Sequence, residues 1–381
     1  MSICSKVLAV AVVVGCAAFA QDIDLASSTR IDLPADSPVT LISTNMDQSR
    51  ASTRGGTIVL DLHMSLTLRN SAARRVRGVV LLVTAQEFAP GGKGSIARPS
   101  IDVPPNQNFT VPIDIRLVRP VMQTGGPLVR VQLDGVLFDD LSFYGPNKLN
   151  SQRAMTFWEV EAQRDRAYYK QTLQAKGEAG LQKEIQATLA RDAARPQLDV
   201  ALTRGGRATP SPMATLATND HLAQFAFLTI PGAPVQPLEG WAAVSGNEAR
   251  SPEIEVLNQS AKPIRYVEIG WMVKDRDGQE YLAGSIPASE SILLPAGHST
   301  RLAQQTSLKF SHAGKPVEIQ SMTAFVSQVE FADGHVWVPS RQDLSASPLL
   351  RIMAPSTEEQ RLADIYSKKG LAALVAELNR Y

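Results

Sequence analysis

The sequence feature that most restricts the fold is an internal repeat. Three blocks of sequence recur in the same order, and the numbers of their first residues differ by 188, 190 and 193. The blocks are Asn70–Val83 with Asn258–Trp271, Val103–Thr110 with Leu293–Thr300, and Leu133–Pro146 with Val326–Pro339. Repetition of several blocks with nearly constant spacing is typical of a duplicated structural unit. We therefore expect two copies of one unit, separated only by small changes in loop length.

The blocks within each copy read as β-strands. Thr57–Leu68 (TIVLDLHMSLTL) alternates apolar and polar residues, which predicts a strand with one buried face. In the second copy Tyr266–Lys274 also alternates, and the Asp-Gly pair within Asp275–Gly278 is a strong signal for a hairpin turn. Short strands separated by Gly, Pro and Asp every ten residues or so favour a β-sandwich over a parallel α/β sheet.

Each copy resembles the immunoglobulin-like or fibronectin-like β-sandwich domains of exported bacterial proteins. In the second copy the resemblance is carried by Asn258–Gly278, by the turn Leu293–Ser299 (LLPAGHS) and by Val329–Trp337 (VEFADGHVW). The first copy departs from it at Ala89–Gly94 (APGGKG), which replaces the hairpin. The cysteine pair of antibody domains is absent. The resemblance implies a fold alone, because such sandwiches carry many unrelated functions.

The apolar spacing changes to a helical period after each sandwich. In Ser151–Gly177 the apolar residues fall on one face, and a second helix with Leu181, Ile185 and Leu189 is expected before Pro196. Near the C-terminus Ser356 and Glu359 have the spacing of a capping box. Aligning Gly180-Leu181 with Gly370-Leu371, with a gap of three residues, suggests that the helical pair is repeated too. Helices this short must pack on something, either within the chain or on a partner.

The expected fold is therefore mainly β with appended helices: two duplicated immunoglobulin-like β-sandwiches, each followed by a helical hairpin. The expected segments are a signal peptide (1–20), the first sandwich (21–150), the first helical hairpin (151–195), a linker (196–224), the second sandwich (225–350) and the C-terminal helical hairpin (351–381).

The N-terminus has the pattern of a secretory signal. Lys6 precedes the apolar run Val7–Val14, and Ala18-Phe19-Ala20 predicts cleavage before Gln21. Val13-Val14-Gly15-Cys16 also resembles a bacterial lipobox, so acylation of Cys16 and a lipid anchor form a second route. We expect an exported protein, periplasmic or extracellular, or a lipoprotein, with no transmembrane helix in the mature chain. The only two cysteines lie in the signal, so no internal disulfide is expected.

The composition and motifs exclude several kinds of function. The 38 basic and 37 acidic residues leave almost no net charge, which argues against a nucleic-acid partner. The five histidines are far apart in the sequence and match no metal-binding spacing. We therefore predict no catalytic residue, no cofactor and no metal. A hydrolase with an unrecognised acid pair, for which Asp139-Asp140 is one candidate, remains an alternative.

Two sets of residues are candidates for binding. A basic cluster suits an anionic partner such as a lipid headgroup or an acidic polysaccharide, although solvated arginines around a turn would look the same; it consists of Arg69, Arg74, Arg75 and Arg77. A platform for stacking sugars would draw on Trp158, Trp241, Trp271 and Trp337, of which Trp271 and Trp337 read as core positions.

The leading hypothesis is an exported, non-enzymatic protein of the bacterial envelope that acts in binding, adhesion or scaffolding. Its partner would be an unidentified protein or an envelope polysaccharide, and exposed sandwich edges would also permit self-association. A carbohydrate-binding module is the second hypothesis and a secreted hydrolase the third.

Overall fold

The computed structural model describes residues 24–85, 91–121, 127–204, 221–288, 292–304 and 306–381. Within them the chain is mainly β and divides into two compact units, Met1–Ser151 and Gln152–Tyr381, here called the N-terminal and C-terminal units. The predicted signal peptide, with Cys16, lies outside the described residues, and so does most of the predicted linker.

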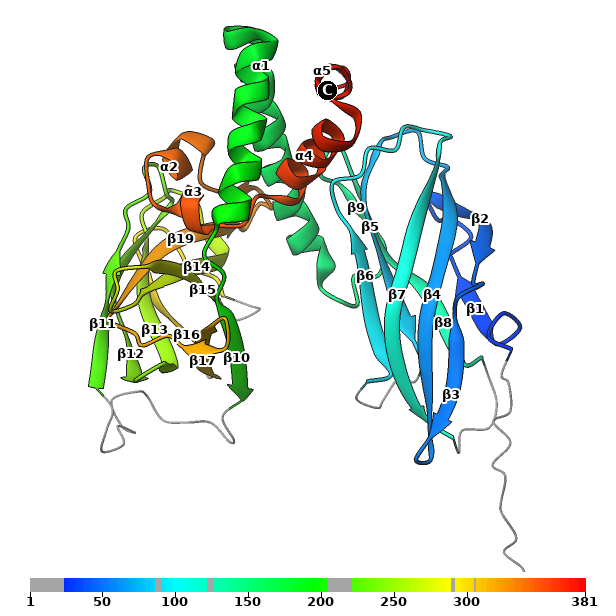
Figure 1. Ribbon diagram of the computed structural model, residues 1–381, viewed down its shortest axis with the longest axis horizontal. Coiled ribbons are helices and arrows are strands. Elements are labelled where there is room, and N and C mark those ends of the chain that lie inside the picture. The colour runs from blue at the N-terminus through cyan, green and yellow to red at the C-terminus, as the bar shows by residue number, and fades with distance from the viewer. Residues whose placement is uncertain (1–23, 86–90, 122–126, 205–220, 289–291, 305) are drawn as a thin grey trace, which may run out of the picture. The chain divides into compact units, whose positions relative to one another are not determined.

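The N-terminal unit is built from two β-sheets (Figure 1). One sheet has the order β1-β8-β5-β6, with β9 on β8, and the other has β4 between β7 on one side and β2 and β3 on the other. Only β1 and β8 pair in parallel. The strands are β1 (Thr29–Asp32), β2 (Val39–Asn45), β3 (Arg50–Arg54), β4 (Thr57–Asn70), β5 (Val76–Thr84), β6 (Lys93–Arg98), β7 (Asn108–Pro120), β8 (Val129–Phe138) and β9 (Phe143–Tyr144).

The core of this unit lies between the two sheets. The predicted alternation along β4 is confirmed from Leu60 to Leu68, because the alternate residues are buried while the residues between them are partly or fully exposed; the buried ones are Leu60, Leu62, Met64, Leu66 and Leu68. These leucines belong to one apolar cluster with the inward residues of β5, β7 and β8. At about 25 cal/mol per Å² of buried apolar surface, this contact is the main source of stability available to a sandwich without disulfides.

The C-terminal unit contains a second sandwich (Figure 1). Its strands follow the order β10-β17-β13-β12-β11-β19-β14-β15, with β16 on β13, β18 on β17 and β20 on β19. They are β10 (Asp199–Arg204), β11 (His221–Phe227), β12 (Val235–Ser245), β13 (Glu248–Asn258), β14 (Ile264–Lys274), β15 (Glu280–Pro287), β16 (Ser299–Ala303), β17 (Thr306–His312), β18 (Lys315–Pro316), β19 (Ser321–Phe331) and β20 (Val336–Trp337). Strand β11 pairs with β12 through its first half and runs parallel to β19 through its second.

Aromatic rings fill the centre of this second core. Trp271 is fully buried, and its ring meets those of Phe225 and Phe310 edge to face, with centroids 5.6 and 5.7 Å apart. Edge-to-face contacts of this kind add to the energy of burial alone. The aromatics come from β11, β14 and β17, so they join strands from both faces of the sandwich.

A buried asparagine makes the same hydrogen bonds in each sandwich. Asn70 Nδ2 donates to the carbonyl oxygens of Arg74 and Val103, at 2.8 and 2.9 Å. Asn258 Nδ2 makes the corresponding bonds, at 2.9 and 3.0 Å, to the carbonyls four and 36 residues further along the chain. Both asparagines are completely buried. Each one therefore ties the end of a long strand to the loop that follows and to the opposite sheet.

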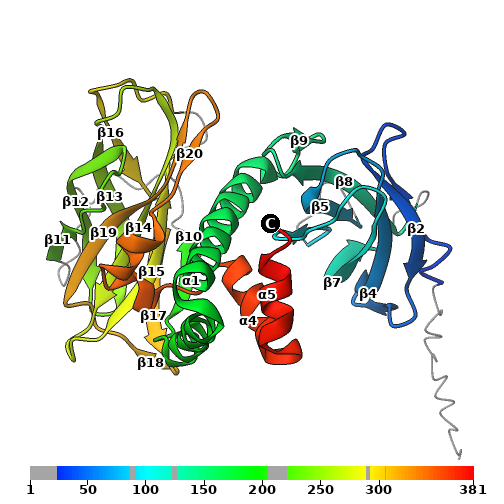
Figure 2. The same cartoon turned by 90° about the horizontal axis from the view of Figure 1, so that it is seen from above.

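The helices of the described chain belong to the C-terminal unit, although the first residue of α1, Ser151, is the last residue of the N-terminal unit (Figure 2). They are α1 (Ser151–Ala194), α2 (Arg341–Ser345), α3 (Leu349–Ile352), α4 (Thr357–Lys369) and α5 (Leu371–Leu378). Gly177 interrupts α1 with φ 66° and ψ −169°, a conformation open in practice only to glycine. The chain turns back there, because Tyr169 Oη lies 2.8 Å from Thr188 Oγ1 across the break.

The break in α1 lies three residues before the glycine that the sequence comparison paired with Gly370. The sequence suggested Gly180 as the partner of Gly370, but Gly180 lies inside the helical segment and Gly177 has the left-handed φ that Gly370 also has. Gly177 and Gly370 differ by 193 positions, the same offset as the last sandwich block, so no gap is needed. One apolar cluster then contains three pairs of residues at this offset: Tyr169 with Leu362, Leu181 with Leu374, and Ile185 with Leu378.

Candidate functional site in the C-terminal unit

A pair of adjoining cavities lies where α1 crosses the second sandwich. The first, of about 230 Å³, is lined by residues from both halves of α1 and from the segment that runs from α2 to α4: Trp158, Glu161, Arg164, Arg191, Arg341, Leu344, Leu350, Met353, Ala354, Pro355, Ser356, Thr357 and Glu359. The second, of about 280 Å³, reaches the sheet formed by β14, β15 and β19. Because the two share Glu161, Arg164, Leu344 and Met353, they adjoin each other.

The first half of α1 is held against the sheet by contacts of Phe157 and Arg153 with residues of the second sandwich. The ring of Phe157 is buried in the second core, 6.2 Å from that of Tyr266. One turn earlier Arg153 stacks on the same tyrosine at 4.2 Å and binds Glu330 at 2.7 Å. Residues four and seven positions after Phe157 lie on the same helix face, so Glu161 and Arg164 are directed toward the sheet as well.

The start of α2 places a buried arginine in the wall of the first cavity. Ser340 and Asp343 form a capping box, which fixes Arg341 as the first residue of the helix. The Arg341 side chain is only 6% exposed, and its guanidinium stacks on the ring of Tyr168 at 4.9 Å. Its Nη1 lies 2.7 Å from Glu359 Oε1, close enough for an ion pair. The directions of its N–H bonds fit no hydrogen bond within the described residues.

The start of α4 is fastened to α1 on the other side of the cavity. The predicted capping box is confirmed, since Ser356 Oγ accepts from the backbone N–H of Glu359 and Glu359 Oε2 accepts from that of Ser356. Ser356 Oγ also donates to Asp165 Oδ2 at 2.7 Å. Asp165 is completely buried and receives two hydrogen bonds from Arg164, at 2.9 and 3.0 Å.

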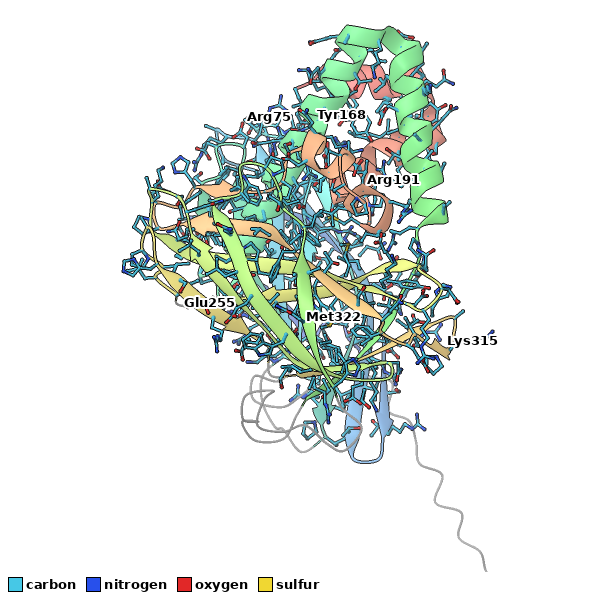
Figure 3. The ribbon with its side chains drawn as sticks, turned by 90° about the vertical axis from the view of Figure 1, so that its left-hand side faces the viewer. Arg75, Tyr168, Arg191, Glu255, Lys315 and Met322 are labelled. Atoms are coloured by element: carbon cyan, nitrogen blue, oxygen red, sulfur yellow. The ribbon has the colours of Figure 1, made fainter. Side chains whose placement is uncertain are left out.

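Glu359 is the point at which the charged groups converge. Besides the contact with Arg341, its Oε1 accepts hydrogen bonds from Arg191 Nη2 at 3.1 Å and from Tyr169 Oη at 3.3 Å. Arg191 and Tyr168, which flanks the same cluster, come from the two sides of the break in α1 (Figure 3). Because α1 folds back at Gly177, Arg191 in its second half reaches the Glu359 carboxylate beside Tyr169 from its first half.

Glu161 differs from the other acids around the cavities. It forms no hydrogen bond or ion pair within the described residues, although it lines both chambers. Burial raises its pKa to about 7, because desolvation disfavours the charged form; the nearby positive charge of Arg164 opposes this, and the negative charges of Asp165, Glu268 and Glu359 reinforce it. Near neutral pH this carboxyl can therefore either donate or accept a hydrogen bond.

The cavities bring together carboxylates and guanidinium groups of different pairing. Asp165 and Glu359 are held by arginines, Glu268 accepts a hydrogen bond from Tyr266, and Glu161 is the cavity carboxyl whose pKa is raised to about 7. In the described ranges no three His, Cys, Asp or Glu side chains gather as a metal site would require. What the cavities do offer is a buried guanidinium beside a carboxyl of raised pKa.

The predicted anionic-partner patch lies on and beside β4 and β5 of the N-terminal unit, where its four members are Arg69, Arg74, Arg75 and Arg77. Arg69 is exposed. Arg74 binds Asp140 at 3.0 Å, and Arg75 and Arg77 share the buried carboxylate of Asp102 at 2.9 and 2.8 Å. The structure thus brings the cluster together, with three of its charges paired inside the unit.

The four tryptophans of the predicted sugar platform have different surroundings. Trp158 lines the first cavity, and Trp241 is partly buried beside the guanidinium of Arg301, 5.4 Å from its ring. Trp337 is partly buried in β20, whereas Trp271 is enclosed in the core. A flat row of exposed rings cannot include Trp271.

Sequence reasoning singled out Trp158 among the cavity residues but did not identify the charged residues that matter most. Glu161, Arg164 and Arg341 belong to no motif, and Arg341 is 177 positions beyond Arg164 in the sequence. The one available signal was the capping box at Ser356 and Glu359, which located the start of α4 but not its attachment to α1. Of the helices that the structure describes, none is long and apolar enough to span a membrane.

Comparisons with known proteins give no family for the chain. Neither a protein-family model nor a curated protein matches it. Among the solved structures that align with it, two show how low the similarity is. A transglutaminase of red sea bream has 8% identity and a TM-score of 0.14, covering 76% of this chain, which in turn spans 31% of that enzyme. The infectious bursal disease virus Gx strain structure has 9% identity and a TM-score of 0.13, with 79% and 74% covered. Similarity this low supports no conclusion about fold or function.

Proposed function

We propose that this chain is an exported, non-enzymatic binding protein of the bacterial envelope, and that its ligand enters the cavities of the C-terminal unit. The observation that carries the proposal is Arg341, a buried guanidinium in the cavity wall whose N–H groups find no well-directed acceptor in the described chain. The ion pair with Glu359 engages Nη1, and Nε and Nη2 make no hydrogen bond in the described chain, so an acceptor on a ligand would recover part of the about 1–3 kcal/mol that an unpaired buried donor costs.

The second part of the proposal is that both units descend from one sandwich followed by a helical hairpin. The equal hydrogen bonds of Asn70 and Asn258 support it, as do the strand pairs β5-β8 and β14-β19, which occupy corresponding places in the two sheets. The helical pairs that meet at an offset of 193 extend the correspondence beyond the sandwiches. In this account the helices of the two copies bury each other's apolar faces, which neither could do alone.

A binding test separates this proposal from the hydrolase and carbohydrate alternatives. Purified full chain would be titrated by calorimetry with small carboxylates, acidic and neutral oligosaccharides and peptides, and the same mixtures would be checked for products. Saturable binding that weakens in Arg341→Gln, without turnover, is the expected result. Turnover of any substrate would contradict the non-enzymatic assignment. Binding of neutral sugars unchanged in Arg341→Gln would place the site elsewhere.

Export is tested by the mass of the protein recovered from bacterial envelopes. A chain that begins at Gln21 would be soluble after signal cleavage, and one that begins at an acylated Cys16 would be anchored in a membrane. Either result supports export. A mass that starts at Met1 would contradict it.

A further inference from the structure

The two cavities differ in the chemistry of their walls. The first is charged, with Arg164, Arg191 and Arg341 facing Glu161 and Glu359. The second is mainly apolar, and its walls include Leu282, Phe325, Pro339, Leu344 and Met353.

On the sheet side of the second chamber, Gly270 leaves room for the phenyl ring of Phe325 to lie flat against the strand. Gly270 and Phe325 are directly paired on β14 and β19, and a side-chain carbon at Gly270 would come within 2.4 Å of the phenyl ring. Two of the polar groups in this chamber already have partners. Tyr266 Oη donates to Glu268 Oε2 at 2.7 Å, and Ser327 Oγ donates to the Glu268 carbonyl at 2.9 Å. This chamber therefore favours an apolar group over a polar one.

We infer that the paired cavities bind a small amphiphilic carboxylate, with its carboxylate beside Arg341 and its apolar tail over Gly270 and Phe325. The inference rests on the proposed function, and it adds the chemical class of the ligand. A guanidinium presents its N–H groups in a fork that matches a carboxylate. The chambers, of about 230 and 280 Å³, together fall in the usual size range of small-molecule sites.

Glu161 stands at the junction of the chambers and adds a dependence on pH. A carboxylate ligand would lie close to it, so binding favours the protonated form, which can donate a hydrogen bond. The charged groups around Glu161 are Arg164, Asp165 and Arg191 on α1, Arg341 on α2, Glu268 on β14 and Glu359 on α4. Of these, the arginines remain charged and oppose the loss of affinity as the pH rises. We expect binding to weaken above pH 7 and to lose this dependence in Glu161→Gln.

The test is calorimetry on the full chain at pH 6 with decanoate, decanol and decyltrimethylammonium. Decanoate should bind and the other two should not. Arg341→Gln should weaken binding about tenfold or more, the effect expected for lost hydrogen bonds to a charged group. Arg301→Gln, an exposed arginine of the same unit, is the matched control and should leave the affinity within about twofold.

A second variant keeps the test valid if Arg341→Gln unfolds. Ser285→Phe fills the apolar chamber from β15, whose lining includes neither Arg191 nor Arg341, and should abolish decanoate binding. Decanol binding as tightly as decanoate, or decanoate binding unchanged in Ser285→Phe, would overturn the inference. If propionate or an acidic oligosaccharide binds through Arg341 and decanoate does not, the tail assignment is wrong and the proposed function stands. If no probe in either panel binds, both fail.

Discussion

The titration of Glu161 provides a quantitative test of the cavity. Its pKa rises from 4.5 to about 7 in the folded protein, so between these values the folded chain keeps a proton that the unfolded chain has lost. In that window each pH unit removes about 1.4 kcal/mol from the free energy of unfolding. The full window would remove about 3 kcal/mol. Because the side chain is only half-buried and cavity water screens it, we expect about 2 kcal/mol.

The variant Glu161→Gln cannot lose this proton and should escape the penalty. Its free energy of unfolding should nearly equal that of the wild type at pH 4.5 and exceed it by about 2 kcal/mol at pH 8. Urea unfolding at intervals of one pH unit gives the difference directly, and all other titrating groups cancel in the comparison. Glu178→Gln, an exposed glutamate on the same helix, is the control and should show no such trend. A difference that stays constant with pH, or that grows toward acid, would refute the reasoning.

Five further substitutions, in three sets, test the framework. Asn70→Ala and Asn258→Ala should each lower the free energy of unfolding by about 2–4 kcal/mol, because each leaves buried carbonyl oxygens without donors. Urea unfolding gives the size of the loss, and hydrogen exchange should show that it is confined to the unit that carries the substitution. A loss of protection spread over both units would contradict this. Gly177→Ala and Gly370→Ala should each cost about 1–3 kcal/mol in thermal unfolding from backbone strain alone, since no neighbour lies within 4 Å of the added carbon; a neutral result at either site would count against the turn geometry. Asp102→Asn should cost about 3 kcal/mol or more in chemical unfolding, because it weakens a buried site shared by two arginines; a change below 1 kcal/mol would show that the pairs contribute little.

The sequence predicted those features that depend on local pattern. The alternation in Thr57–Leu68, the helical period after Ser151 and the capping box at Ser356 follow from spacing within a few residues, and the structure has all three. The mainly β fold also follows from such spacings. The helical period of Ser151–Gly177 also ends at the residue where the structure breaks α1.

The candidate site could not be predicted because it depends on tertiary contacts. Arg341 and Glu161 come together only when α1 lies across the second sandwich and α2 follows the last strand. The raised pKa of Glu161 is likewise a product of burial, which no local pattern encodes. The arginines of the predicted patch were recognisable by their clustering, but Asp102, 25 residues beyond Arg77, was not recognisable as their partner.

The most direct test of the account is hydrogen–deuterium exchange of the full chain with and without decanoate, read by mass spectrometry. The account predicts slower exchange in peptides from the first half of α1, from residues 339–359 and from β15, with little change in the N-terminal unit. No protection in these segments at a saturating concentration, or protection confined to the N-terminal unit, would contradict the claim that the cavities of the C-terminal unit are the binding site.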